Sequence, residues 1–359
     1  MLKNIKNRAS QPGKQIKLLI SAAALCCAFT NTAQAIPYSQ ISQVYFFGDS
    51  LTDSGFNNLF PEPVLVPGKA RTFTTWQGYT WSQYVAHNVK GFDLPVYGTM
   101  SPVADTITNN EIFSVYNPVP SIVSPILDGV DYACGGATTD SPAAPPISWA
   151  PSVHAQIEYF LDTHPGQLDP KAVFFIWAGA NDILNAFGTD PSPANLILTA
   201  NNAAMNIAKD VARLSRHGAK RIVILSLPNL GVTPLIQEAA VMEGDPTLPA
   251  TAQSLTFTFN SMLNQKLGEV ILTHRVKVLY VNVYTLLDNV IKSTQAGKPY
   301  VVAGQPFTFV NYTDPICSGS SLVCTVTSQD YIFADSIHPT GEAHRLLSLY
   351  VEEQLKAWA

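Results

Sequence analysis

The sequence predicts an α/β protein in which a central parallel sheet is covered by helices on both faces. Four short runs, rich in β-branched or aromatic residues, are apolar on both faces; they lie at residues 44–48, 172–178, 221–227 and 276–283. Runs that are apolar on both faces are typical of parallel strands buried between two layers of helices. Because helical stretches separate these runs, we expect right-handed crossovers and a three-layer α/β/α arrangement.

Three longer stretches have the spacing of helices. Residues 195–217 end at Gly218, which favours a helix terminus, and residues 249–274 carry polar side chains at helical intervals. The last helix is predicted over residues 339–358, with Pro339 near its first position.

Residues 60–151 differ in composition from the rest of the chain. They are rich in Pro, Gly, Thr and aromatic residues and contain few periodic runs, so they form either long functional loops or short irregular strands. We find neither a linker nor a repeat that would separate them, and we expect one domain over residues 36–359.

Residues 1–35 are predicted to be a signal peptide. Five basic side chains precede an apolar stretch at residues 18–30, and Ala33-Gln34-Ala35 matches an A-x-A cleavage site. The apolar stretch is shorter than the about 20 residues that a membrane-spanning helix needs. We expect cleavage after Ala35 and a secreted or periplasmic protein.

The composition excludes a disordered chain and disfavours nucleic acid as a partner. The protein has 359 residues, of which 47% are hydrophobic and only 13% are charged. The signal peptide holds five of the 21 basic residues and none of the 26 acidic ones, so 16 basic and 26 acidic residues remain, a net charge of −10. That sign is wrong for binding a phosphate backbone.

Three cysteines remain after the signal peptide. Cys317 and Cys324 are close in sequence, and in an exported protein this spacing predicts a small disulfide loop; the alternative is two unpaired thiols. No histidine or second cysteine pair lies near them, which argues against a metal site. Cys134 is most simply a small buried residue.

Ser50 follows the first predicted strand. The carboxyl ends of parallel strands form the edge of the sheet at which ligands bind. We expect a helix to begin at Ser50, where free backbone N–H groups favour the negative charge that develops when a serine attacks a carbonyl. As a helix cap alone Ser50 needs no partner, whereas as a nucleophile it needs a base. Asp49 is expected to bond its own turn, and Asp53 to brace the following segment.

A candidate base lies near the end of the chain. His338 precedes Pro339, which favours an extended conformation, and Asp335 is close enough to accept a hydrogen bond from its Nδ1 and fix the tautomer. An isolated Asp-x-x-His is usually a surface turn. The remaining histidines lack such a setting and are expected to be structural or exposed: His87, His154, His164, His217, His274 and His344.

Two further stretches provide candidate donors for an oxyanion. Asn181 follows the second predicted strand and either donates its side-chain NH₂ to an oxyanion or caps a helix. Gly135 and Gly136 either let backbone N–H groups approach a substrate or form a tight turn.

Taken together, these stretches resemble the motifs of the GDSL or SGNH serine esterases and lipases. The motifs are GDSL at 48–51, GGA at 135–137, GAND at 179–182 and DSIH at 335–338, in the family's order. Residues 71–86, RTFTTWQGYTWSQYVA, are also similar to secreted bacterial members. Within the family the chain is most similar to phospholipase A, lysophospholipase and glycerophospholipid:cholesterol acyltransferase enzymes.

The resemblance implies a flavodoxin-like SGNH-hydrolase fold and a mechanism without a metal or cofactor. It implies that Ser50 is the nucleophile, His338 the base and Asp335 the residue that orients His338. It further implies that the oxyanion is held by the Ser50 N–H, by one glycine N–H and by Asn181. We assign the glycine as Gly136 in preference to Gly135.

The expected substrate is a phospholipid or lysophospholipid ester, with a membrane surface as a further partner and a sterol as an acyl acceptor. Two alternatives remain. A carbohydrate O-deacetylase would use the same triad on a small acetyl ester, and a secreted binding or adhesion module would keep the fold without activity.

Overall fold

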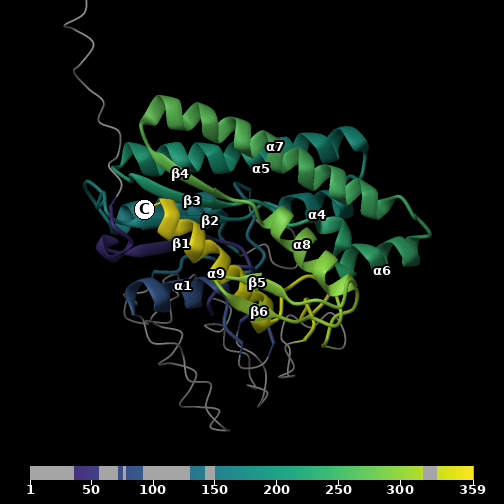
Figure 1. Ribbon diagram of the computed structural model, residues 1–359. Helices are drawn as coiled ribbons and strands as arrows, with labels where there is room; N and C mark the ends of the chain where they lie inside the picture. The colour runs from purple at the N-terminus through teal and green to yellow at the C-terminus, as the bar shows by residue number, and fades with distance from the viewer. Residues whose placement is uncertain are drawn as a thin grey trace, which may run out of the picture.

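The computed structural model describes residues 36–55, 72–75, 78–91, 130–141, 150–317 and 330–358. The predicted signal peptide and Cys324 therefore lie outside the described residues. Four strands form one parallel sheet in the order β1-β2-β3-β4 (Figure 1). They are β1 (Val44–Gly48), β2 (Val173–Trp177), β3 (Arg221–Leu225) and β4 (Lys277–Val281). The four predicted strands are confirmed, with ends that differ by up to two residues.

The segment at residues 130–134 lies along the free side of β1, where it acts as a further edge of the sheet. Phe46 N donates to Val130 O (2.9 Å), Tyr132 N to Phe46 O (2.8 Å) and Cys134 N to Gly48 O (3.1 Å). The chain thus moves from β1 to one side and then passes β1 to build β2, β3 and β4 on the other side. Ligands of open α/β sheets bind at such a reversal, at the carboxyl ends of the strands.

Helices cover both faces of the sheet. One face packs against α3 (Val153–Thr163), α5 (Pro193–Arg216) and α7 (Leu248–His274), and the other against α1 (Trp81–Lys90), α8 (Val283–Gln295) and α9 (Gly341–Trp358). In Figure 1, α5 and α7 lie on one side of the strands and α1 and α9 on the other. The predicted three-layer α/β/α arrangement is confirmed.

Successive side chains of each strand enter different cores, as alternation along a strand requires. In β2, Phe174 and Ile176 pack with α3, α5 and α7, whereas Val173, Phe175 and Trp177 pack with α1, α8 and α9. This two-sided burial explains why the strands are continuous apolar runs.

The remaining elements lie mostly at the carboxyl edge of the sheet or beside it. They are η1 (Tyr38–Gln40), α4 (Ala180–Thr189), η3 (Leu230–Val232), α6 (Pro234–Glu243), β5 (Tyr300–Val302) and β6 (Gln305–Phe307). Among the described residues, no helix combines the length and the apolar character that a membrane span requires.

Local sequence signals set the helix ends. Pro193 and Pro234 occupy the first positions of α5 and α6, where a missing N–H costs nothing. Helix α3 begins after Ser152, whose Oγ accepts from Ala155 N (3.2 Å). Helix α9 begins at Gly341, two residues later than predicted, because Pro339 pairs with Phe333 in an antiparallel bridge.

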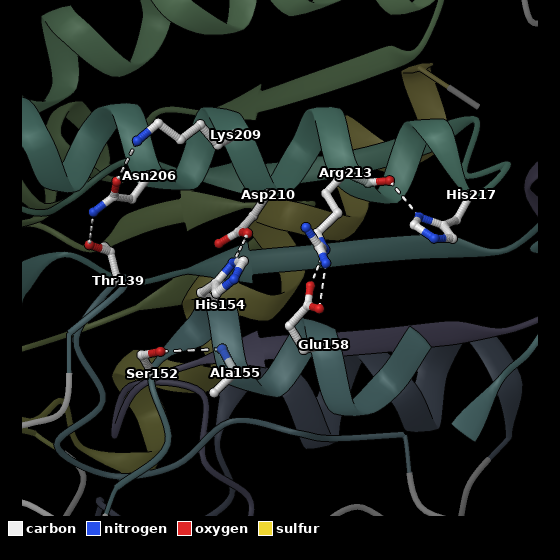
Figure 2. Close-up of polar contacts among 10 residues, drawn as sticks. All are labelled: Thr139, Ser152, His154, Ala155, Glu158, Asn206, Lys209, Asp210, Arg213 and His217. Atoms are coloured by element: carbon white, nitrogen blue, oxygen red, sulfur yellow. Dashed lines mark hydrogen bonds and ion pairs between the residues drawn. The ribbon is translucent and has the colours of Figure 1, made fainter. Parts of the chain in front are cut away.

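A polar layer between α3 and α5 fixes α3 beside the sheet (Figure 2). His154 Nδ1 lies 2.8 Å from Asp210 Oδ1, and Arg213 pairs with Glu158. Asn206 of α5 donates to Thr139 Oγ1 (3.3 Å), on the loop that leads from the edge segment to α3. Burial raises the pKa of Asp210 to about 6, although the hydrogen bond from His154 opposes the shift.

Fixing α3 matters because its Gln156 holds the end of β1. The Gln156 side chain is completely buried; its Oε1 accepts from Gly48 N (2.9 Å), and its Nε2 donates to Gly48 O (2.8 Å). The backbone N–H and the backbone carbonyl of Gly48 are therefore both bonded to the side-chain amide of Gln156, which belongs to α3 in the neighbouring layer. These two bonds fix the position of Gly48, and the turn that contains Ser50 begins directly after it.

Gly48 also lacks room for a side chain. A Cβ at this position would lie 2.4 Å from the carbonyl oxygen of Trp177 in the adjacent strand. Gly48→Ala is therefore expected to lower the free energy of unfolding by about 1–3 kcal/mol, since neither backbone can move without breaking sheet pairing. Denaturant titration of the variant measures this change.

Gly268→Ala is the matched control. Gly268 is an exposed residue of α7 with open space around its would-be Cβ, and alanine favours a helix over glycine by up to about 1 kcal/mol. We expect this variant to be at least as stable as the parent. If Gly48→Ala and Gly268→Ala both have the free energy of unfolding of the parent protein, a Cβ at position 48 does not clash with the carbonyl oxygen of Trp177.

Candidate active site

Ser50 lies in the turn that follows β1. Asp49 O accepts from both Thr52 N and Asp53 N (3.0 Å each), and Asp49 Oδ1 accepts from Leu51 N (3.0 Å). The expectation of a helix at Ser50 is wrong, because residues 50–52 form only a single turn. The expectation that Asp49 bonds its own turn is confirmed. In this turn the Ser50 N–H has no acceptor among the described residues.

Ser50, His338 and Asp335 form one chain of hydrogen bonds, although Ser50 and His338 are 288 residues apart. His338 Nε2 lies 2.7 Å from Ser50 Oγ, and His338 Nδ1 lies 2.8 Å from Asp335 Oδ2. The three residues are 9%, 3% and 4% exposed, respectively, so the chain is shielded from bulk water. With Nδ1–H donating to Asp335, Nε2 is left to accept a proton from Ser50.

The loop that carries Asp335 and His338 is held in several places. Asp335 Oδ1 also accepts from Ile337 N (2.9 Å) and His338 N (2.7 Å), and Ala334 N donates to His338 O (2.7 Å). Leu235 N, at the start of α6, donates to Ser336 O (2.8 Å). These bonds order the backbone and the carboxylate together.

Residues 72–75 brace the same loop from the other side. The ring of Phe73 packs against the imidazole of His338, with centroids 4.9 Å apart. Thr74 Oγ1 donates to Pro339 O (3.0 Å), and Gly341 N donates to Thr75 Oγ1 (3.0 Å). Residues 72–75 are thus partly a support for the histidine loop, a role that their composition alone did not indicate.

The charges around His338 favour an ionised Asp335. Burial alone would raise the Asp335 pKa, but the charge of His338 and the hydrogen bonds from His338 and Ile337 outweigh it and lower the pKa below its ordinary value. Burial raises the pKa of Asp49 to about 7. The pKa values of these two acids, both near Ser50, are therefore shifted in opposite directions.

Asn181 is the second residue of α4, whose cap residue is Gly179. Its Nδ2 donates to Ala137 O (2.9 Å), which leaves the second hydrogen of the amide for another acceptor. The neighbouring Asp182 accepts from Thr139 N (3.0 Å) and Thr139 Oγ1 (2.8 Å), and burial raises its pKa to about 6. The hydrogen bonds between Asp182 and Thr139 tie α4 to the loop that follows residues 130–134.

The structure distinguishes Gly136 from Gly135. Gly135 N donates to Asp53 Oδ2 (2.8 Å), and Ala137 N donates to Cys134 O (3.0 Å). Between them, Gly136 has a φ of 82°, which favours glycine, and its N–H has no acceptor among the described residues. Gly136 is therefore the glycine of this pair whose N–H remains available as a donor, and its role in holding an oxyanion stays a prediction.

Cys317 is buried beside the histidine loop, and its N–H donates to Ala334 O (2.9 Å). It is disulfide-bonded, and its partner lies outside the described residues. The pairing with Cys324 stays a prediction. Cys134 is a free, buried thiol, as expected.

Two residues of the site were not singled out by the sequence: Gln156, which holds Gly48, and Phe73, which packs on His338. Asp53 was expected only to brace the segment that follows it, but it also reaches Gly135 across 82 residues of chain. No group of three or more metal-binding side chains lies together among the described residues. What the site offers is a buried serine hydroxyl beside an imidazole, with three nearby segments carrying unused N–H donors.

Comparisons with known proteins agree with this chemistry. The model of the family described as GDSL-like lipase/acylhydrolase matches residues 44–351. A GDSL esterase/lipase of Arabidopsis thaliana is 27% identical, over 90% of this chain and 92% of its own length. Esterase EstA of Pseudomonas aeruginosa is also 27% identical, over 94% of this chain but only 50% of its own length, so the chain spans about half of that relative.

Among solved structures, an acetylxylan esterase from Geobacillus stearothermophilus aligns with a TM-score of 0.43 and 14% sequence identity. The alignment covers 87% of this chain and 93% of the esterase.

The burial of His344 predicts how the free energy of unfolding changes at acid pH. His344 is completely buried, accepts a hydrogen bond from Trp81 N (3.3 Å), and its pKa is lowered to about 3 by burial and by the nearby His338. In the unfolded chain the same side chain titrates near 6.5. Between these values the unfolded chain binds a proton that the folded protein does not, so lowering the pH favours unfolding through His344.

We expect His344→Gln, which stays neutral, to lose less stability than the parent between pH 7 and pH 5. The difference between the two proteins isolates His344, because their buried carboxylates titrate alike. Denaturant titrations at both pH values measure it. Parallel pH dependences in parent and variant would contradict the lowered pKa.

Proposed function

Because the chain belongs to the GDSL-like lipase/acylhydrolase family, we propose that it is a secreted serine esterase that hydrolyses phospholipid or lysophospholipid esters. The observation that carries the catalytic part of this proposal is the hydrogen-bonded chain from Ser50 through His338 to Asp335. Nucleophile, base and orienting acid are then in contact before any substrate binds.

In the acylation step, Ser50 Oγ attacks the ester carbonyl while its proton passes to His338 Nε2, 2.7 Å away. The carbonyl oxygen becomes an oxyanion. When the tetrahedral intermediate collapses, the bond to the alcohol breaks and His338 returns the proton to the leaving alcohol. Asp335 stabilises the imidazolium that exists between these transfers.

Three donors from separate segments hold the oxyanion: the Ser50 N–H, the Gly136 N–H and the second hydrogen of the Asn181 amide. Their segments are linked, since Cys134 N bonds Gly48 O (3.1 Å) and Asn181 Nδ2 bonds Ala137 O (2.9 Å). Donors fixed in advance stabilise a developing charge without having to reorganise.

In the deacylation step, His338 takes a proton from water, and the water oxygen attacks the acyl carbonyl. The bond to Ser50 Oγ then breaks, and the serine recovers its proton from His338. A sterol hydroxyl in place of water would give acyl transfer by the same proton movements, and we propose this as a second outcome of the acyl-enzyme.

A lipid substrate is supported by the exposed surface of α6, whose first turn contacts the histidine loop, as well as by the sequence resemblance. Helix α6, which starts at the hydrogen bond from Leu235 to Ser336, exposes the apolar side chains of Leu235, Val241 and Met242. Apolar side chains in this place suit an acyl chain or a lipid surface better than a sugar. The signal-peptide pattern adds export to the proposal, to the periplasm or the exterior.

The proposal predicts that the protein cleaves p-nitrophenyl esters of medium and long chains and releases fatty acid from mixed phospholipids and lysophospholipids. Ser50→Ala should lower turnover by at least about 10³-fold while the thermal midpoint stays nearly unchanged. Ester turnover, lipid mass spectrometry with cholesterol present, and thermal unfolding measure these properties.

Cleavage confined to acetyl esters would favour a carbohydrate O-deacetylase over a lipid esterase. Turnover by Ser50→Ala within tenfold of the parent would contradict the assignment of the nucleophile. A parent protein that turns over no ester would favour the binding module.

Asn181→Ala is expected to lower kcat by about 10²–10³-fold with little change in KM, because the donor acts on the oxyanion rather than on the bound ester. Steady-state kinetics on the best p-nitrophenyl ester measures both constants. A change in KM alone would make Asn181 a residue that binds substrate or caps α4.

A further inference from the structure

A single buried carboxylate joins the nucleophile turn to the loop of Gly136. Asp53 Oδ2 accepts from Gly135 N (2.8 Å), and Asp53 Oδ1 accepts from Gly55 N (2.8 Å). The backbone of Asp53 belongs to the turn of Ser50, because Asp53 N donates to Asp49 O (3.0 Å). Asp53 is completely buried. The carboxylate therefore spans two segments that must keep a fixed separation if both serve one oxyanion.

The bond to Gly135 also decides which N–H of the loop is available. The N–H groups on either side of Gly136 are taken, that of Gly135 by Asp53 and that of Ala137 by Cys134 O. With both neighbours fixed and a φ of 82° at Gly136, the peptide between Gly135 and Gly136 has one orientation. Rotation of that peptide would turn the Gly136 N–H away and present a carbonyl oxygen instead.

We propose that Asp53 is a positioning residue that fixes the Gly136 N–H as an oxyanion donor by binding the N–H of Gly135. The inference rests on the proposed esterase function. Asp53 touches no reacting atom; it acts through the loop. Its loss is expected to weaken binding of the transition state and to leave binding of the ground-state ester unchanged.

The variant for the test is Asp53→Asn, which keeps the shape of the side chain. An amide has one oxygen, so one of the two N–H groups that Asp53 binds loses its acceptor whichever way the amide turns. We expect kcat to fall by at least about 10-fold, up to the 10²–10³-fold that loss of a whole oxyanion donor causes, with KM unchanged.

Asp131→Asn is the matched control. Asp131 is as buried as Asp53 and also accepts from a backbone N–H two residues ahead, that of Ala133 (2.9 Å), but its other hydrogen bonds come from the side chains of Ser54 and Ser82 and not from the Gly135–Gly136 backbone. Burial, with the charge of Asp53 adding to it, raises the pKa of Asp131 well above its ordinary value. We expect this variant to lose stability and to keep the parent kcat when assayed well below its midpoint.

A boronic acid with the acyl chain of the best substrate separates positioning from a general structural effect. It forms a tetrahedral adduct on the serine, so its affinity reports binding of the transition state. For Asp53→Asn this affinity should fall in proportion to kcat, and for Asp131→Asn it should not change. Equal losses in both variants, or an unchanged kcat and boronate affinity in Asp53→Asn, would overturn the proposal.

Amide exchange on the unmodified protein keeps the test independent of how the variants fold. The Gly135 amide should be protected in the free protein, and the Gly136 amide should become protected only in the boronate adduct. An exposed Gly135 amide, or a Gly136 amide that the adduct leaves unprotected, would overturn the proposal. If the parent protein turns over no ester and takes up no boronate, the proposed function fails instead.

Discussion

The backbone of Gly48 is the fixed point on which the site depends. Its carbonyl accepts hydrogen bonds from Gln156 and from Cys134 N, and its N–H donates to the same glutamine side chain. The neighbouring strand leaves no space for a Cβ there. Because Ser50 follows two residues later, its position is inherited from the sheet, from α3 and from the edge segment at once. The polar layer between α3 and α5 thereby contributes to a site that it does not touch.

The second constraint is electrostatic. A serine hydroxyl is a weak nucleophile unless its proton has a destination, and a buried imidazolium is costly unless an anion faces it. The loop that ends in His338 meets both needs, since Asp335 is held ionised by the histidine and by backbone N–H groups. Phe73 packs against the imidazole, and Thr74 and Thr75 hold the backbone that follows His338. The site is therefore organised by contacts that exist without substrate.

The sequence predicted those features that depend on local pattern. Strands buried on both faces are continuous apolar runs, and Pro and Gly mark helix ends, so the parallel sheet and the long helices were predictable. The edge segment at residues 130–134 is short and runs directly into Gly135 and Gly136, so the sequence did not distinguish it from a turn. The helix expected at Ser50 was wrong because the chain makes only one turn there, closed on Asp49 O, and this turn already leaves the Ser50 N–H without an acceptor among the described residues. Contacts such as Gln156 with Gly48 join residues 108 positions apart and leave no local signal.

The proposed function depends most on Ser50 being a nucleophile activated by His338. The most direct measurement is the rate and site of labelling by a fluorophosphonate probe, with peptide mapping of the product. We expect the probe to label Ser50 in the parent protein and to label the folded His338→Ala variant far more slowly. A label on another residue, or an equal rate in the variant, would contradict it.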